Sequence, residues 1–335
     1  MSLERTAVVG AGSWGTALAN LIAKKGAETI LWSFEPEVAE TIRSEQVNRR
    51  YLDGVKLDPR LRVTTRMEEA LSGASVVLSV SPSHVVRPVM AQAARHIAPG
   101  TLVVSASKGI ENESLKTMDE VLADVLPREV ECAYLSGPSF ALEVGEEHPT
   151  AVTIASHSAD AASRAQALFQ TPYFRVYTSS DVRGVELGGS LKNVIAIAAG
   201  IVEGLGYGNN TTAALITRGL AEITRLGVAA GAEPVTFAGL AGMGDLILTC
   251  TGALSRNRQV GVELGRGRPI DEILGGMVAV AEGVRTARSA RDLSHRMEIE
   301  MPIVEVVYSM LYEGLLATSA LERLMLREPR PETWG

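Results

Sequence analysis

Residues 6–24 read Thr6-Ala-Val-Val-Gly10-Ala-Gly12-Ser-Trp-Gly15-Thr-Ala-Leu-Ala-Asn-Leu-Ile-Ala-Lys24. The run from Thr6 to Val9 is apolar and rich in β-branched residues, which predicts a short strand. Gly10, Gly12 and Gly15 then complete G-x-G-x-x-G as the apolar spacing becomes helical. Such glycines also occur in plain loops, but a strand, a tight turn and a helix in this order are typical of a site where backbone N–H groups hold a pyrophosphate. The stretch therefore predicts a dinucleotide-binding turn.

Further strand-like runs follow this turn, with helical patterns between most of them. The runs are 29–32, 76–80, 102–106, 133–135 and 151–155, and the helical patterns include 85–97, 115–125 and 159–169. Alternation of continuously apolar strands with helices predicts an α/β fold of the Rossmann type, with a parallel sheet covered on both faces. Ligands of such sheets bind at the carboxyl ends of the strands. Lys108 follows one strand end there, and it is either a ligand contact or a solvated loop cation.

The second half of the chain has a different pattern. Beyond about residue 180 the strand signal fades, and helical patterns run to the end, near 181–203, 211–230, 234–240, 255–265, 270–276, 284–297, 303–313 and 318–327. We therefore expect a dinucleotide-binding domain over residues 1–180 and an all-helical substrate domain over residues 181–335, which agrees with the usual size of two domains.

Composition narrows the class of protein. The 335 residues carry a net charge of −7, which argues against a nucleic-acid surface. Cys132 and Cys250 are too few for a disulfide framework, and the five histidines form no dense cluster, so we predict no metal. The longest uncharged apolar run, 193–202, is shorter than the roughly 20 residues that span a bilayer. With no signal-peptide pattern before the first strand, we expect a cytoplasmic protein without a membrane span.

The stretch 188–209 holds one lysine, Lys192, in a helix of mostly small residues. Small faces permit close backbone approach, so this helix is expected in the interior. A lysine there either extends its amine to solvent or does chemistry. Burial can lower a lysine pKa enough for the amine to accept a proton near neutral pH, as oxidation of an alcohol requires.

Two further segments carry polar groups among glycines. Asp245 follows Gly239-Leu-Ala-Gly242-Met-Gly244, where an aspartate can simply accept N–H groups of a glycine-rich turn. Ser255-Arg256-Asn257 stands at an expected helix start, where a guanidinium, an amide and helix N–H groups suit a phosphate.

These segments together resemble the bacterial-type NAD(P)-dependent glycerol-3-phosphate dehydrogenases over essentially the whole length of the chain. The resemblance rests on Gly10-Ala-Gly-Ser-Trp-Gly15, Ser107-Lys108-Gly109, Ser136-Gly-Pro-Ser139, the signature from Gly189-Ser-Leu-Lys192-Asn193 to Gly208-Asn209, Gly244-Asp245-Leu246, Ser255-Arg-Asn257 and Glu282-Gly283. It implies a Rossmann domain followed by a helical domain like that of 6-phosphogluconate dehydrogenase, often in a homodimer.

The resemblance also implies roles for individual residues. Lys192 matches the proton acceptor, with Lys108 and Asp245 as further catalytic candidates. The positions that match substrate contacts are Lys108, Gly137, Ser139, Lys192, Asp245, Ser255, Arg256 and Asn257. Besides Gly10, Gly12 and Gly15, the positions that match cofactor contacts are Ser13, Trp14, Tyr51, Lys108, Ala141, Arg256, Val280 and Glu282. The reaction implied interconverts dihydroxyacetone phosphate and sn-glycerol 3-phosphate and supplies glycerophospholipid synthesis.

The choice between NAD and NADP depends on residues after the second strand. Relatives often carry an arginine there, whereas this chain has Ser33-Phe34-Glu35. A 2′-phosphate is normally met by an arginine and a free 2′-hydroxyl by an acid. Glu35 contacts the ribose or merely begins the next helix, and Arg49 or Arg50 could restore NADP binding. We expect a preference for NAD, with Ser33 and Phe34 beside the cofactor.

Two other functions remain open from the residues. A dehydrogenase of the same plan could act on a β-hydroxyacid, which would need a carboxylate site in place of Ser255-Arg256-Asn257. A catalytically silent dinucleotide sensor would be favoured by the loss of Lys192 or Asp245, and both are present.

Overall fold

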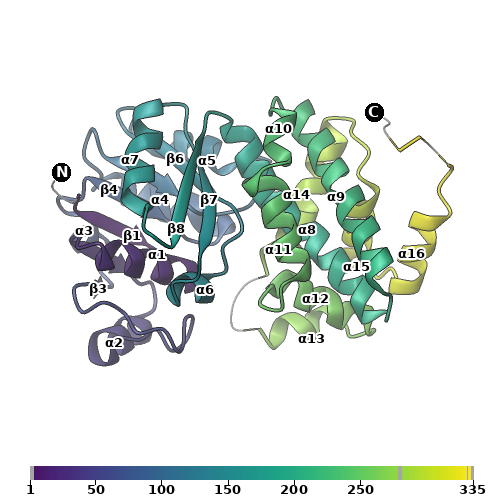
Figure 1. The fold of residues 1–335 in the computed structure, drawn as a ribbon, viewed down its shortest axis with the longest axis horizontal. Coiled ribbons are helices and arrows are strands. Elements are labelled where there is room, and N and C mark those ends of the chain that lie inside the picture. The colour runs from purple at the N-terminus through teal and green to yellow at the C-terminus, as the bar shows by residue number, and fades with distance from the viewer. Residues whose placement is uncertain (1–3, 278–280, 330, 333–335) are drawn as a thin grey trace. The chain divides into compact units, whose positions relative to one another are not determined.

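The computed structural model describes residues 4–277, 281–329 and 331–332. Contacts between residues divide the chain into a sheet unit, residues 1–108 and 116–185, and a helical unit, residues 109–115 and 186–335. Figure 1 shows strands and helices together in the first unit, and helices without labelled strands in the second. The expected combination of a Rossmann-type domain with a helical domain is therefore confirmed.

The sheet unit contains one eight-stranded sheet in the order β3-β2-β1-β4-β5-β6-β7-β8. The strands are β1 Thr6–Val9, β2 Thr29–Trp32, β3 Arg62–Thr64, β4 Val76–Ser79, β5 Leu102–Ser105, β6 Glu131–Ser136, β7 Thr150–Ala155 and β8 Phe174–Ser179. Its helices are α1 Ser13–Lys24, α2 Pro36–Glu45, α3 Met67–Leu71, α4 Ser83–Ala94, α5 Met118–Val125, α6 Ala141–Gly145 and α7 Ala159–Phe169. The reversal of strand order after β1 puts the switch point next to the glycine turn, where ligands of such sheets bind.

The sheet differs from expectation in one pairing. All neighbours are parallel except β6 and β7, which pair antiparallel through Leu135 and Ile154. The expected parallel sheet is therefore confirmed as a mainly parallel one that contains this antiparallel pair. Between the two strands the only helix is α6, and five residues span about 7.5 Å, too little to cross the face of the sheet. The chain therefore returns in the opposite direction.

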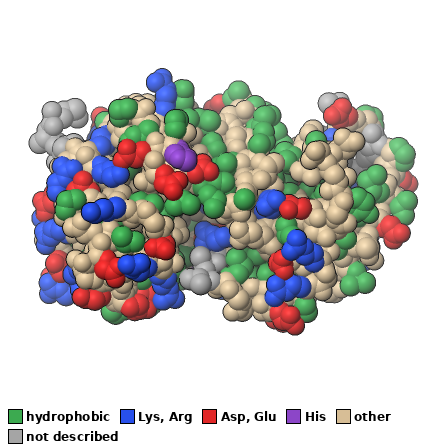
Figure 2. Space-filling model, turned by 60° about the horizontal axis from the view of Figure 1, so that its bottom comes forward, with side chains coloured by type: hydrophobic (Ala, Val, Ile, Leu, Met, Phe, Trp, Pro, Cys, Tyr) green, Lys and Arg blue, Asp and Glu red, His purple; other side chains and the backbone are tan. Residues whose placement is uncertain are grey.

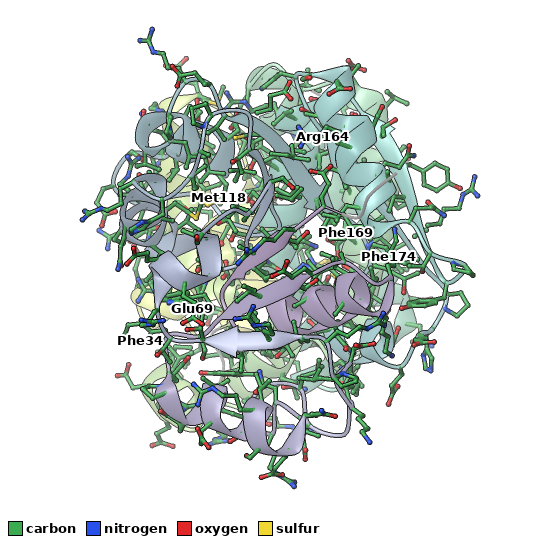
Figure 3. The ribbon with its side chains drawn as sticks, turned by 90° about the vertical axis from the view of Figure 1, so that its left-hand side faces the viewer. Phe34, Glu69, Met118, Arg164, Phe169 and Phe174 are labelled. Atoms are coloured by element: carbon green, nitrogen blue, oxygen red, sulfur yellow. The ribbon has the colours of Figure 1, made fainter. Side chains whose placement is uncertain are left out.

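Two strands carry no continuous apolar run and were not expected. β3 is three residues long with an exposed first residue, and β8 alternates buried and exposed positions from Phe174 to Tyr177. Strands covered on both faces are apolar throughout, whereas half-covered strands alternate. Phe174 packs against Phe169 of α7, and Figure 3 shows the two rings together.

The helical unit holds all the remaining elements. They are α8 Val182–Gly204, α9 Asn209–Ala229, α10 Pro234–Phe237, the π-helical turn η1 Leu240–Gly244, α11 Asp245–Thr251, α12 Arg256–Gly265, α13 Ile270–Gly275, α14 Glu282–Arg296, α15 Pro302–Tyr312 and α16 Ala317–Met325. The first four residues of α8 belong to the sheet unit. From there α8 runs through the interior of the bundle (Figure 1).

Within the part of the chain that the structure describes, two helical stretches are long and apolar enough to cross a membrane by length and composition, α8 and residues 234–251. The apolar window of α8 is wholly buried inside the protein. Its hydropathy is therefore explained by its place as the core helix of the bundle, as the small residues around Lys192 predict. The second stretch is divided into α10, η1 and α11.

Candidate active site

The turn Gly10–Gly15, called the phosphate turn below, has little room for side chains at two of its three glycines. Gly10 has φ +123°, and a Cβ there would lie 2.9 Å from the carbonyl oxygen of Val80. A Cβ on Gly15 would lie 1.9 Å from the carbonyl oxygen of Gly10. A Cβ on Gly12 would meet nothing within 4 Å, so this position faces open space. The turn thus combines a tight backbone with an open approach at Gly12.

The start of α1 fits an anionic ligand. Gly12 is its N-cap, no side chain caps it, and its first turn contains no acidic residue. Trp14, in the same turn, has a buried indole N–H with no hydrogen-bond partner among the described residues. Uncapped N–H groups and the helix dipole favour a negative charge at such an end. The residues present therefore fit a dinucleotide pyrophosphate at Gly12, Ser13 and Trp14.

Asn48 fixes the phosphate turn from outside it. Its buried amide donates to the carbonyl oxygen of Ala11 at 2.9 Å and to the hydroxyl of Thr16 at 2.8 Å. The same side chain accepts the backbone N–H of Tyr51 at 3.1 Å. The sequence did not predict this role of Asn48, because nothing local links it to a turn 37 residues away.

The end of β2 presents the residues expected at the ribose. The Ser33 hydroxyl donates to the carbonyl oxygen of Glu35 at 2.9 Å, and the Tyr51 hydroxyl donates to the Glu35 carboxylate at 2.8 Å. Glu35 is also the N-cap residue of α2, so it does begin the next helix. Phe34 is 77% exposed, and Figure 3 shows it at the periphery of the sheet unit near Glu69.

The two arginines considered for NADP binding are engaged with acids. Arg49 pairs with Glu45 four residues earlier, and Arg50 pairs with Glu37 at 3.1 Å. Both pairs are exposed, and exposed pairs contribute at most about 1 kcal/mol. Such pairs can exchange partners easily.

At the carboxyl ends of β5 and β6 the structure brings three expected residues together. The Lys108 ammonium donates to the carbonyl oxygen of Gly137 at 3.2 Å, and the Ser139 hydroxyl donates to the same oxygen at 3.0 Å. Gly137 has φ +135°, and a Cβ there would lie 3.0 Å from Cα of Val152. Ala141 follows as the first residue of α6.

Buried hydroxyls mark this same edge of the sheet. Ser79, Ser105 and Ser136 end the neighbouring strands β4, β5 and β6, and their hydroxyls are buried without a hydrogen-bond partner among the described residues. A buried polar group without a partner is costly and is usually satisfied by water or a ligand. These hydroxyls therefore fit the expectation that ligands bind at the strand ends.

In the helical unit, Lys192 is buried with two partners. Its ammonium donates to the Asp245 carboxylate at 2.6 Å and to the Thr249 hydroxyl at 2.7 Å. The side chains of Lys192 and Asp245 are 9% and 2% exposed. Lys192 therefore does not extend its amine to solvent. We call Lys192, Asp245 and Thr249 the Lys192 cluster.

Asp245 directly follows the glycine-rich π-helical turn η1 and is the first residue of α11. Its carboxylate accepts a hydrogen bond from Lys192, a residue outside that turn. Gly242 permits that turn, since a Cβ there would lie 2.2 Å from the carbonyl oxygen of Phe237. Thr249 lies one turn further along α11 and donates its hydroxyl to the carbonyl oxygen of Asp245 at 2.6 Å. The i, i+4 spacing puts Asp245 and Thr249 on one face of α11.

Cys250, next to Thr249 in the chain, is also buried from solvent. It is 2% exposed, and burial raises the pKa of its thiol to about 12, with the Asp245 charge adding to the shift and the Lys192 charge opposing it. A thiol in that state is inert. Both cysteines are free.

The start of α12 holds the other expected phosphate residues. Ser255 is its N-cap and accepts the backbone N–H of Arg258 at 3.2 Å. Asn257 donates its amide to the Asn193 side chain at 2.9 Å and accepts the backbone N–H of Gly283 at 2.9 Å. Asn257 therefore ties the residue after Lys192 to the start of α14. Arg256 follows Ser255 and interacts with the charge of Glu282, whereas Val280 lies outside the described residues.

Close packing of α8 on α12 fixes this arrangement. A Cβ on Gly200 would lie 2.0 Å from the carbonyl oxygen of Arg258, and one on Gly261 would lie 2.0 Å from that of Ile197. One turn further on, Gly204 and Gly265 are as tightly packed against the opposite helix. The two backbones therefore touch, as the small residues of 188–209 predict, and the start of α12 has a fixed position relative to Lys192.

The described residues hold no group of three or more His, Cys, Asp or Glu side chains that could bind a metal ion. Figure 2 shows acidic and basic side chains interspersed on the face that it draws, with no extended basic surface there. Charge is therefore mixed rather than concentrated on this face, in contrast to a nucleic-acid surface.

Comparison with known families matches both halves of the chain. Residues 5–162 match the family model described as the NAD-dependent glycerol-3-phosphate dehydrogenase N-terminus, and residues 181–322 match the model of the C-terminus of the same enzymes. The two models together cover most of the chain.

Individual relatives match along nearly the full length. The glycerol-3-phosphate dehydrogenase [NAD(P)+] of Geobacter sulfurreducens is 56% identical over 333 residues, 99% of each chain. The corresponding protein of Geobacter metallireducens is 57% identical over 331 residues, 98% of this chain and 99% of that one. The crystal structure of glycerol-3-phosphate dehydrogenase from Coxiella burnetii is similar with a TM-score of 0.94 at 38% identity, over 97% of this chain and 99% of that one.

Proposed function

This chain belongs to the NAD-dependent glycerol-3-phosphate dehydrogenase family, and we propose that it interconverts dihydroxyacetone phosphate and sn-glycerol 3-phosphate. The cofactor is NAD or NADP, as in the names of its relatives. The observation that carries the proposal is the buried Lys192 cluster, which holds an amine 2.6 Å from a carboxylate inside the helical unit. A β-hydroxyacid dehydrogenase or a silent sensor has no comparable support.

Lys192 moves the proton of the reaction. When the C2 hydroxyl of glycerol 3-phosphate is oxidised, the Lys192 ammonium must first release a proton, and the neutral amine then accepts the hydroxyl proton while the hydride leaves C2. In the reverse direction the ammonium returns a proton to the carbonyl oxygen. Asp245 and Thr249 fix the position of Nζ, which keeps the amine aligned for general acid–base catalysis.

The substrate phosphate binds at the start of α12. Arg256 offers a planar fork of donors, and the N–H groups of the first helical turn add to it. Asn257 holds this helix start beside Asn193, so it positions the site as well as lining it. In the sheet unit, Lys108, Gly137 and Ser139 are proposed as further substrate contacts because they share one carbonyl oxygen.

The sheet unit, residues 1–180 in this proposal, binds the cofactor, and residues 181–335 carry the substrate chemistry. When bound, the nicotinamide supplies the hydride acceptor or donor. Gly10, Gly12, Ser13, Trp14 and Gly15 hold the pyrophosphate, while Ser33, Phe34 and Tyr51 lie at the ribose and adenine. Ala141, Glu282, Val280 and Arg256 complete the proposed contacts.

We expect a preference for NAD over NADP. Glu35 accepts a hydrogen bond from the Tyr51 hydroxyl, and its negative charge would repel a 2′-phosphate. The two arginines that could attract this phosphate are paired with acids, Arg49 with Glu45 and Arg50 with Glu37. Comparison of kcat/KM for NADH and NADPH at one ionic strength tests this. A ratio that favours NADPH would contradict the preference and indicate that Arg49 or Arg50 leaves its acid.

The reaction itself is tested by absorbance at 340 nm with dihydroxyacetone phosphate and each reduced cofactor. Oxidation of the cofactor with glycerol 3-phosphate as the product supports the proposal. Its absence with both cofactors, in protein shown to be folded by circular dichroism, would refute it.

Substitution of Arg256 tests the phosphate site. Arg256→Ala removes charge-assisted hydrogen bonds, at about 1.5–3 kcal/mol, so kcat/KM falls far more for dihydroxyacetone phosphate than for unphosphorylated dihydroxyacetone. Arg266→Ala, at the other end of α12, is the matched control and leaves the ratio unchanged. Equal losses on both substrates would show that Arg256 does not bind the phosphate.

We further propose that the enzyme works in the cytoplasm as a homodimer and supplies glycerophospholipid synthesis. These properties rest on the family resemblance. Sedimentation equilibrium tests the dimer, and a monomer at micromolar concentration would contradict it.

A further inference from the structure

Four helices of the helical unit surround a cavity of about 250 Å³ that the reaction does not use. Its walls come from α8, α9, α15 and α16, and neither Lys192 nor Asp245 lines it. Most of the lining residues are apolar, with Ile201, Leu215, Val306 and Leu324 among them. Apolar cavities of about 150 Å³ already accept benzene. This one therefore has room for a longer hydrocarbon.

Helix α16 forms one wall of the cavity. Its lining residues Ala317, Ala320, Leu321, Leu324 and Met325 recur at helical spacing and so form a single stripe. The helix is nine residues long and packs on α15. A short helix held by one apolar stripe can separate slightly from its neighbours at low cost, which gives a chain access to the cavity.

Charged groups on the lining favour an anion. Arg218 and Arg225 lie seven residues apart on α9 and hence on one face, and Arg327 follows α16. Arg218 donates to the carbonyl oxygen of Glu332 at 3.0 Å, and Arg327 pairs with Glu300 at 2.9 Å. A guanidinium has five N–H donors, so such contacts are compatible with binding of a further anion.

Glu222 is the acidic residue among the described lining residues, and its carboxylate forms hydrogen bonds with backbone N–H groups of α15. Its carboxylate accepts the N–H of Ile303 at 2.9 Å and that of Val304 at 3.3 Å, at the start of α15. The positive end of that helix offsets the charge of Glu222. Glu300 is a second acid beside these groups, since it pairs with Arg327 and its charge acts on Arg225. Three arginines against two acids leave an excess of one positive charge around the cavity.

We propose that this cavity binds a single-chain anionic amphiphile, with its alkyl chain between α9, α15 and α16 and its head group at Arg218, Arg225 and Arg327. Aliphatic walls account for the chain. The planar arginine forks account for the head, because they bind carboxylate and phosphate with two parallel hydrogen bonds.

Titration calorimetry of the full chain with octanoate, nonanoate and decanoate tests the proposal, without cofactor or substrate. We expect one saturable site whose affinity rises about fourfold per methylene. Decan-1-ol, which lacks the charge, binds at least about tenfold more weakly than decanoate. Decyl phosphate in place of decanoate distinguishes a phosphorylated lipid from a fatty acid as the natural ligand.

Three variants locate the site. Leu321→Trp fills the cavity from α16 and abolishes decanoate binding. Arg218→Gln lowers the affinity for decanoate about tenfold or more and leaves the affinity for decan-1-ol unchanged. This second variant tests the proposal even if Leu321→Trp does not fold. Arg323→Gln, which removes an exposed arginine of α16 outside the lining, is the matched control and binds decanoate like the wild type.

Absence of saturable binding, equal affinity for decanoate and decan-1-ol, or undiminished binding to folded Leu321→Trp would each overturn the proposal. A further outcome would also overturn the proposal: decanoate gives no heat of binding, and Leu321→Trp converts a dimer to monomers. This result would show that a second copy of the chain covers the region instead. Because binding is measured without turnover, failure here leaves the dehydrogenase proposal untouched, and the reverse also holds.

Discussion

The phosphate turn of the sheet unit presents backbone groups, whereas the Lys192 cluster of the helical unit presents a charged side chain. At the turn, the groups that face a ligand are backbone N–H groups, and glycines leave the space for it. In the cluster, the group that we propose to react is a buried side chain, the Lys192 amine, held by a carboxylate 2.6 Å away. A backbone site is sensitive to added atoms, while a buried charged site is sensitive to the loss of a partner. The predictions below depend on that contrast.

The largest effect is expected at Lys192. Lys192→Met removes the proton acceptor, so kcat falls about 10²-fold or more. It also leaves Asp245 buried without its cation, which costs about 3–5 kcal/mol of folding free energy. Affinity for NADH should stay close to that of the wild type, because the phosphate turn belongs to the other unit. Steady-state kinetics, urea unfolding and cofactor fluorescence measure the three quantities.

The double variant Lys192→Met with Asp245→Leu separates these effects. An apolar pair of similar volume restores most of the lost stability but none of the activity. A kcat within about threefold of the wild type in either variant would exclude Lys192 as the general base.

A second buried carboxylate sharpens the comparison, because helix N–H groups rather than a lysine hold it. Burial raises the pKa of Glu222 from 4.5 to about 7 despite its bonds to Ile303 and Val304. Between these two pH values the folded state keeps a proton that the unfolded state has lost. The free energy of unfolding therefore falls as pH rises from 4.5 to 7, by about 3 kcal/mol in all.

Glu222→Gln removes this contribution, and urea unfolding across that pH range measures it. The variant should gain stability relative to the wild type as pH rises and should level off above pH 7. Glu322→Gln on α16 is an exposed control. A difference between Glu222→Gln and wild type that stays constant with pH would show that Glu222 does not titrate in this interval.

The smallest effects are expected at two glycines three residues apart. Gly15→Ala puts a Cβ 1.9 Å from the Gly10 carbonyl oxygen, and overpacking of this kind costs about 1–3 kcal/mol of stability. Gly12→Ala meets open space, so its melting temperature should match that of the wild type while its affinity for NADH falls. Thermal melts and cofactor titration measure both, and equal melting temperatures for the two variants would contradict the steric argument.

Sequence patterns predicted the elements whose signal is local. The phosphate turn, β2 and the buried helix around Lys192 follow from periodicity and composition. β8 was not expected because it is covered on one face only, and the reversal at β7 depends on the shortness of α6. The contact of Lys192 with Asp245 joins residues 53 positions apart. No local pattern reports such a contact, and only the family resemblance linked the two residues.

Asn48 and Thr249 show the same limit within the sites. Each is an ordinary polar residue whose importance comes from a partner distant in sequence, Ala11 for the first and Lys192 for the second. Asx and hydroxyl side chains satisfy local backbone groups in most turns and helices. Their types alone therefore do not distinguish a residue that holds a site from one that holds a loop.

The contact between α8 and α12 also bears on how genetic variation in this enzyme should be read. Gly200, Gly204, Gly261 and Gly265 are places where any side chain would strike the backbone of the opposite helix. In a saturation-mutagenesis screen all four should tolerate almost no replacement, and a missense variant at any of them would score like one at a reacting group. The growth phenotype alone would therefore not distinguish residues of this helix–helix contact from residues that take part in the reaction. Measurement of protein abundance together with activity distinguishes the two cases. A variant at one of the four glycines lowers the amount of folded protein, whereas the double variant Lys192→Met with Asp245→Leu does not.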